Sequence, residues 1–313
     1  VRSSAASDVY KRQILGWGHC RFHHTKNNWG NLVGLVLAIA QIVIIIYGST
    51  IGFRRLDIRH EDFYSPDVPA EFDGYRIVQF SDAHLGTYRG SSSKILKKVI
   101  DSINAQKPDL IVFTGDLQNM APDELYDFIP LLSSLYAKDG VCSILGNHDY
   151  SDYIKADDVT KVANERELIS REREFGWSLL LNDNKTIRRG NDSIIVAGLE
   201  NDGRKGEPKR ADISKALAGV DSRNFVLMLA HDPRLWRRDI LPNSRAQLTL
   251  SGHTHAMQFE IFGWSPASLM YDEWGGMYHE GDRALNVSIG MGGFIPFRIG
   301  ASNEIVVITL HRK

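Results

Sequence analysis

Side chains that bind metal ions recur in this chain directly after short apolar runs. In chain order the clusters are Asp82-Ala-His84, Gly115-Asp116, Gly146-Asn-His-Asp149, His231 and His253-Thr-His255. Carboxylate, amide oxygen and imidazole ligands together suit Mn, Fe, Zn, Ni or Co better than Ca or Mg. Two such cations about 3.5–4 Å apart bind a phosphoryl oxygen and lower the pKa of a bridging water. The pattern therefore predicts a site with two divalent transition-metal ions.

The spacing within each cluster indicates how its side chains reach an ion. Asp82 and His84 stand two apart, so on an extended segment they project to the same side and chelate one cation. His253 and His255 repeat this spacing, although a bend in the loop sends them to different ions. A carboxylate at Asp116, after a glycine that permits a close turn, can bridge two cations. Taken alone, His231 could be an ordinary hydrogen-bonded polar residue, and Asp82 could be a turn residue. The five clusters together favour metal ligands.

The elements that carry these clusters are predicted to be buried strands. The apolar runs at 75–80, 110–114, 141–145, 225–230 and 247–251 are rich in Val, Ile and Leu, which is typical of strands covered on both faces. Ligands bind at the carboxyl ends of strands in an open α/β sheet. We also expect helices at 91–103, 122–129 and 161–175, and strands at 194–198, 284–288 and 304–310.

These clusters, in this order from Asp82 to His255, resemble the calcineurin-like metallophosphoesterases. The resemblance implies an α/β, four-layer sandwich of two mixed β-sheets flanked by helices. It also implies that one metal takes Asp82, His84, Asp116 and His255, and the other takes Asp116, Asn147, His231 and His253. His148 would then face the substrate and protonate the leaving oxygen, with Asp149 orienting or charging it.

The chain is most similar to the membrane-associated bacterial branch of that family. The stretches 72–82 and 296–300 carry this closer similarity. The branch includes enzymes resembling UDP-diacylglucosamine hydrolases, so a lipid-linked or nucleotide-linked phosphate is the expected substrate. One departure is Ala256-Met257, where many members have Gly-Gly; it predicts a stiffer loop and a narrower substrate range.

The amino-terminal part predicts a membrane anchor. No charged residue lies between Lys26 and Arg54, and about 20 apolar residues suffice to cross a bilayer. A buried core helix and a cleaved signal peptide are the alternatives, and the orientation stays open because basic residues flank both ends. We therefore expect a basic segment at 1–28, whose first 13 residues read as non-native adapter sequence, a transmembrane anchor at 29–53, and a catalytic domain at 54–313.

Charge and cysteine content exclude some functions. Lys+Arg 37 against Asp+Glu 38 shows no electrostatic footprint for nucleic acid, and two cysteines cannot build a zinc-thiolate site. The expected partners are a phosphorylated small-molecule or lipid-linked substrate and the bilayer. Two alternatives remain: a phosphoprotein phosphatase, and a metal-binding scaffold without hydrolysis. The scaffold is disfavoured because every ligand of the pattern is present.

Overall fold

The computed structural model describes residues 29–202 and 209–313. These residues belong to two compact units, of which the first ends at Ile51 and the second is Gly52–Lys313. The expected basic segment 1–28, with its first 13 residues, lies outside the described part of the chain. The two units are described separately below.

The first unit contains the expected apolar helix, α2, at Trp29–Thr50. Its 22 residues span about 33 Å at 1.5 Å per residue, enough to cross the hydrocarbon core of a bilayer. Only Gly30 and Gly48 are buried, and large apolar side chains are exposed around the helix, unlike those of a core helix. Within the described ranges it is the one helix long and apolar enough to span a membrane.

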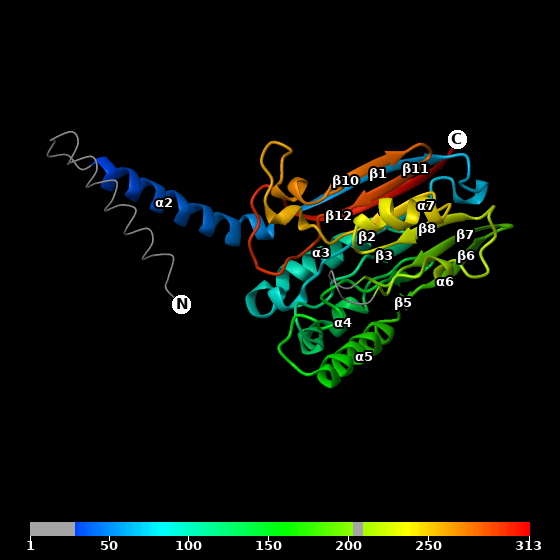
Figure 1. The fold of residues 1–313 in the computed structure, drawn as a ribbon, viewed down its shortest axis with the longest axis horizontal. Helices are drawn as coiled ribbons and strands as arrows, with labels where there is room; N and C mark the ends of the chain where they lie inside the picture. Colours follow the sequence, from blue (N-terminus) through cyan, green and yellow to red (C-terminus); the bar gives the residue numbers. More distant parts are fainter. Residues whose placement is uncertain (1–28, 203–208) are drawn as a thin grey trace. The chain divides into compact units, whose positions relative to one another are not determined.

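The second unit is built on two six-stranded mixed sheets (Figure 1). The first sheet, in spatial order, contains β1 (Leu56–Ser65), β12 (Asn303–Arg312), β2 (Arg76–Phe80), β3 (Leu110–Phe113), β4 (Val141–Ser143) and β5 (Ser178–Leu179). The second contains β10 (Gly276–Glu280), β11 (Arg283–Val287), β9 (Leu248–Ser251), β8 (Phe225–Leu229), β7 (Asp192–Gly198) and β6 (Asp183–Arg189). Strands β2–β4 are mutually parallel, as are β7, β8, β9 and β11.

Helices cover the outer faces of both sheets. The α-helices are α3 (Ser93–Ala105), α4 (Ile129–Leu132), α5 (Asp158–Glu174), α6 (Ile213–Ala216) and α7 (Leu241–Asn243). Short 3-10 turns are η1 (Gly52–Arg54), η2 (Ala70–Phe72), η3 (Leu85–Tyr88), η4 (Gly90–Ser92), η5 (Pro122–Phe128), η7 (His255–Gln258) and η8 (Pro266–Leu269), and η6 (Trp236–Ile240) is a π-helical turn.

Three apolar clusters separate these layers. Because strand side chains alternate between faces, Ile77 of β2 packs between the two sheets while its neighbour Val78 packs outward, in the cluster that contains α3. A third cluster covers the outer face of the second sheet and centres on Trp236. The order helices, sheet, sheet, helices confirms the predicted four-layer sandwich.

Buried polar side chains join the two sheets beside the ligand-bearing ends of the strands. The Gln79 amide on β2 donates to the Ser251 carbonyl on β9 at 2.8 Å, and Asn286 on β11 donates to Gln79 Oε1 at 2.7 Å. Paired polar groups of this kind fix one relative placement of the sheets, because a shift would leave buried amides unpaired.

Candidate metal centre

The five ligand-bearing segments meet at one place between the sheets. They follow β2, β3 and β4 of the first sheet and β8 and β9 of the second. The donor atoms form two groups, each with its atoms within 4.8 Å of one another: Asp82, His84, Asp116 and His255, and Asp116, His231 and His253. Asn147 lies against the second group. All seven predicted ligands are therefore brought together.

In the first group, two imidazole nitrogens and two carboxylates converge. His84 Nε2 lies 3.1 Å from His255 Nε2, and His255 Nε2 lies 3.3 Å from Asp82 Oδ1. His84 Nε2 is 3.7 Å from Asp116 Oδ2. Asp82 and His84 are fully buried. Buried carboxylates at such distances from imidazoles are stable only with a proton or a cation among them.

In the second group, hydrogen bonds fix the side chains so that lone pairs point inward. His231 Nδ1 lies 2.7 Å from the Thr114 carbonyl and donates to it, so Nε2 is the nitrogen that faces the donor group. This nitrogen lies 3.3 Å from Asp116 Oδ2 and 3.1 Å from Asn147 Oδ1. His253 Nδ1 is 2.8 Å from the same Asn147 oxygen. Several acceptors facing one another fit a cation at their centre.

Asp116 belongs to both groups through one oxygen. Its Oδ2 faces His84 and His231, while its Oδ1 accepts a 2.8 Å bond from the His148 backbone N–H. The preceding Gly115 has φ +97°, and a Cβ there would lie 2.5 Å from the Gly146 nitrogen. Glycine is required at this turn both by its conformation and by the close approach.

The backbone at the ligands is not extended, so one expectation about local geometry is wrong. Asp82 and His84 have φ of +53° and +46°, in the left-handed region, yet they still reach the same group. His253 and His255 have φ of +76° and +51° and join different groups, as the bent alternative predicted. Left-handed residues other than glycine cost about 1–3 kcal/mol each and are typical of functional sites.

The electrostatic state of the histidines follows from burial and from Asp116. Burial lowers the pKa of His84 to about 3 and that of His253 to about 4, so both are neutral, the form that binds metals. Burial also acts to lower the pKa of His231, but the Asp116 carboxylate opposes it and raises that pKa to about 10. Metal binding at His231 must therefore displace a proton.

His148 and Asp149 occupy different surroundings. His148 Nδ1 lies 2.7 Å from the Asn119 carbonyl and its ring stacks on Tyr153 at a centroid distance of 4.1 Å. Asp149 is fully buried, and its carboxylate accepts bonds from the backbone N–H groups of Gly146, Asp116, Leu117 and Gln118. The Asn119 carbonyl, and not Asp149 as the resemblance implied, orients the His148 ring.

Sequence reasoning missed four residues that contact the site. They are Asn119 and Tyr153 beside His148, Tyr271, whose hydroxyl lies 3.0 Å from His253 Nε2, and Phe294, whose ring lies 5.6 Å from that of His148. Each lies on an irregular segment outside the recurring clusters. Only the tertiary fold brings them to the metal centre.

The departure at Ala256-Met257 has a conformational meaning. Ala256, Met257 and Gln258 have φ of +49°, +49° and +57°, a region that favours glycine. Ala256 and Met257 therefore adopt a left-handed backbone conformation that glycine adopts more easily, and the turn is strained.

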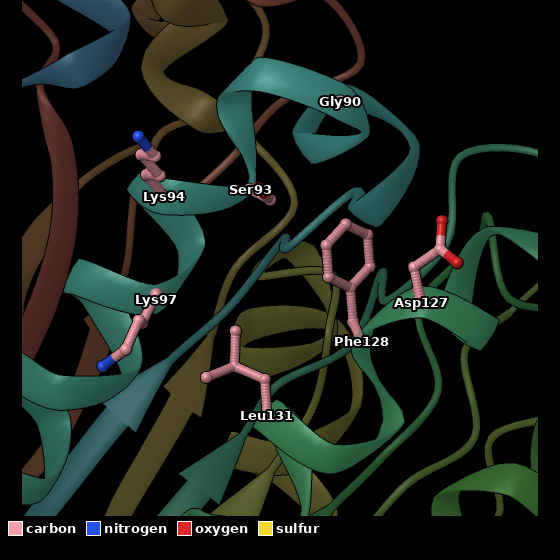
Figure 2. Close-up of a pocket in the computed structure, with 7 residues that line it drawn as sticks. All are labelled: Gly90, Ser93, Lys94, Lys97, Asp127, Phe128 and Leu131. Carbon is pink, nitrogen blue, oxygen red and sulfur yellow. The ribbon is translucent and has the colours of Figure 1, made fainter.

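A separate pocket of about 460 Å³ lies between α3 and the η5–α4 segment (Figure 2). Gly90, Ser93, Lys94, Lys97, Asp127, Phe128 and Leu131 line it. None of these is a predicted ligand, and Lys97 pairs with Asp101 on its own helix. The pocket is not part of the metal centre.

Comparison with known proteins agrees with this geometry. The family model for calcineurin-like phosphoesterases matches residues 75–257, and the chain belongs to that family. Metallophosphoesterase YkuE of Bacillus subtilis is 36% identical over 78% of this chain and 81% of its own length.

More distant relatives include membrane proteins and one with a named substrate. A transmembrane protein with a metallophosphoesterase domain from Danio rerio is 29% identical over 90% of this chain and 63% of its own length. UDP-2,3-diacylglucosamine pyrophosphatase LpxG of Chlamydia trachomatis is 27% identical over 86% and 93%. Among solved structures, Haemophilus influenzae NAD nucleotidase matches 70% of this chain and 45% of its own at 12% identity, with a TM-score of 0.45.

Proposed function

We propose that this protein is a membrane-anchored phosphoesterase with two metal ions that hydrolyses phosphate ester or pyrophosphate bonds of a lipid-linked or nucleotide-linked substrate. The observation that carries the proposal is the pair of donor groups that share Asp116. Each group offers carboxylate and imidazole donors, and Asn147 adds an amide oxygen to the second. This donor set suits Mn, Fe, Zn, Ni or Co.

The proposed chemistry divides between the ions and the protein. When bound, two ions supply Lewis acidity toward the phosphoryl group and a nucleophilic water at neutral pH. His148 supplies the proton for the leaving oxygen. Because its Nδ1 donates to the Asn119 carbonyl, its Nε2 is the atom that exchanges this proton. Stacking on Tyr153 restricts the ring, which keeps Nε2 aimed at one place.

Asp149 acts on geometry in this proposal. By accepting four backbone N–H groups, its carboxylate holds the Gly115–Gln118 turn and the Gly146 turn together. These turns carry Asp116 and Asn147. Asp149 is thus a positioning residue for two ligands.

The membrane part of the proposal rests on α2 and on relatives. We assign residues 29–53 to the anchor and 54–313 to the catalytic domain. A tethered enzyme meets lipid-borne phosphates at high effective concentration. The LpxG relative, named for a diacylated sugar nucleotide, is matched over 93% of its length, which supports a related substrate class.

The test uses the full chain purified in detergent and loaded with Mn²⁺. We expect both ions to bind and a UDP-linked diacylated sugar to be hydrolysed faster than a phosphopeptide. The Asp116→Ala variant is the control for contaminating activity. A preference for the phosphopeptide would favour a phosphoprotein phosphatase, and bound metal without turnover of any ester would favour a scaffold.

A further inference from the structure

Large apolar side chains are exposed on two segments that each also reach the metal centre. We call them the apolar rim: Phe262, Trp264, Leu269, Met270, Phe294 and Ile295. Phe262 is 105% exposed, Leu269 78% and Met270 63%. A water-soluble surface rarely gathers side chains of this size in one place, and such patches mark interaction sites.

The rim is connected to the metal centre at three points. Its longer segment, 261–271, follows the turn that begins with the predicted ligand His255 and ends at Tyr271, whose hydroxyl lies 3.0 Å from His253 Nε2. Its shorter segment contains Phe294, whose ring lies 5.6 Å from that of His148. A molecule that covers the Phe294 end of the rim therefore lies next to His148.

Hydrogen bonds join the bases of the two segments. The Gln258 side-chain amide donates to the carbonyls of Ile295 at 2.9 Å and Phe297 at 2.7 Å. The Glu260 N–H donates to the Ile299 carbonyl at 2.8 Å. Figure 1 shows both segments, in orange and red, at the same end of the sheets.

The composition of the rim fits a lipid surface. From Ile261 to Tyr271 there is no charged residue, and the shorter segment 293–297 has none. Arg298, which follows, is fully buried. Trp, Phe, Leu and Met without charge, with tyrosine at one end, are typical of segments that enter the boundary between headgroups and acyl chains.

Chain connectivity also favours lipid over a protein partner. Gly52 follows the last residue of α2, Thr50, by two positions. A Cβ on Gly52 would lie 1.8 Å from the Arg298 carbonyl, so its backbone packs directly on the stem of the shorter rim segment. Two residues of chain span at most about 7 Å. An anchor in the bilayer therefore keeps this stem close to the lipid.

We propose that the apolar rim inserts into the lipid surface to which α2 holds the protein, so that the metal centre opens onto lipid headgroups. This inference rests on the membrane anchoring in the proposed function. It narrows the substrate class to phosphates carried on a lipid in the same membrane. Phosphate esters dissolved in water do not depend on insertion of the rim, so the rim should not speed their hydrolysis.

The direct test measures the depth of a label in lipid and needs no turnover. The full chain carries Cys20→Ser, native Cys142 is fully buried, and one environment-sensitive fluorophore is attached through Phe262→Cys. The matched control is Val159→Cys, because Val159 is an exposed apolar residue on α5. In nanodiscs with nitroxide-labelled lipids we expect the fluorophore at 262 to be quenched and shifted to the blue, and that at 159 to be neither.

Equal quenching at both positions would overturn the proposal, and so would a blue shift at 262 without lipid quenching, which indicates a protein partner. A second measurement uses the double variant Phe262→Asn and Leu269→Asn. Losing two inserted side chains should slow hydrolysis of a UDP-linked diacylated sugar in vesicles at least about tenfold. Hydrolysis of soluble bis-para-nitrophenyl phosphate should stay unchanged. Quenching at 262 in an inactive protein would support the rim while contradicting the proposed function.

Discussion

The two halves of the metal centre are supported by buried charges of opposite sign. Beside the Asp82 half, the fully buried Arg298 guanidinium donates to backbone carbonyls of the 289–302 loop, among them Ile289 at 2.8 Å and Ala301 at 2.9 Å. Beside the Asn147 half, the buried Asp149 carboxylate accepts backbone N–H groups, at 2.8 Å from Asp116 and Gly146. In the Asp82 half a buried cation holds backbone carbonyl groups, and in the Asn147 half a buried anion holds backbone N–H groups.

This difference has an electrostatic consequence for the ligands. Burial lowers the pKa of Arg298 to about 10, so it stays charged at neutral pH and attracts the nearby Asp82 carboxylate. Burial, reinforced by the Asp116 carboxylate, raises the pKa of Asp149 to about 7. The arginine lowers the cost of burying a ligand charge, whereas the aspartate adds negative charge that bound cations offset. The Asn147 half should therefore depend more on metal for its order.

The largest effect is expected where the halves join. Asp116→Ala removes a carboxylate from both donor groups at once, so we expect loss of both ions and of activity to background. Metal analysis of the purified variant and hydrolysis of bis-para-nitrophenyl phosphate measure the two losses. Retention of metal and turnover would contradict the shared-ligand assignment.

Removing one histidine from each half should separate the two ions. His84→Ala is expected to empty the Asp82 half and His253→Ala the Asn147 half, because each imidazole faces only one donor group. Each variant should retain one ion and lose most of its activity. Stoichiometry from metal analysis decides the point. Loss of both ions in one variant would mean that the half left intact in that variant does not bind metal alone.

His148 belongs to neither donor group, and we propose that it acts as the general acid. His148→Asn should leave metal content intact and slow hydrolysis of an ester with a poor leaving group by about 10²–10⁴-fold, the usual contribution of a general acid. Nitrophenolate needs little protonation, so its esters should be affected less. Equal losses for both kinds of ester would show that His148 is not the acid.

The smallest effects are expected for the two supporting charges. Arg298→Lys should weaken mainly the ion of the Asp82 half, and Asp149→Asn mainly that of the Asn147 half, where it holds the turns of both Asp116 and Asn147. We expect each loss to be about 10–100-fold in affinity, as is usual for partners of metal ligands. Titration with Mn²⁺ measures one half at a time. Arg298→Lys is combined with His253→Ala, which leaves the Asp82 half, and Asp149→Asn with His84→Ala, which leaves the Asn147 half. Equal weakening of both halves by either variant would contradict the division described above.

The main architecture and the clustering of the predicted ligands could be read from the sequence, because each of these residues directly follows a strand along the chain. The apolar runs before Asp82, Asp116, Asn147, His231 and His253 became β2, β3, β4, β8 and β9, as predicted. Local patterns also placed α3 and α5 to within a few residues. The segment at 122–129 is instead mainly a 3-10 turn, η5, followed by the short α4.

What the sequence could not show depends on contacts between distant segments. The sequence of strand β1 contains several charged residues, such as Arg59, and no apolar run. It forms a strand because it pairs along its whole length with β12. On that strand, Glu304 accepts a 3.2 Å hydrogen bond from Arg59. The left-handed backbone at Asp82 and His84 and the buried position of Arg298 likewise follow from packing. No local pattern marks any of them.

The left-handed backbone at Asp82, His84, Asp116, His253 and His255 links metal supply to the lifetime of the protein. Strain at these positions lowers the stability of the metal-free chain. Ions that bind only the folded state restore it, by about 4 kcal/mol at a concentration 1,000 times the Kd. Unfolded chains are degraded in cells, so a cell short of metal should contain less of this protein as well as less of its activity.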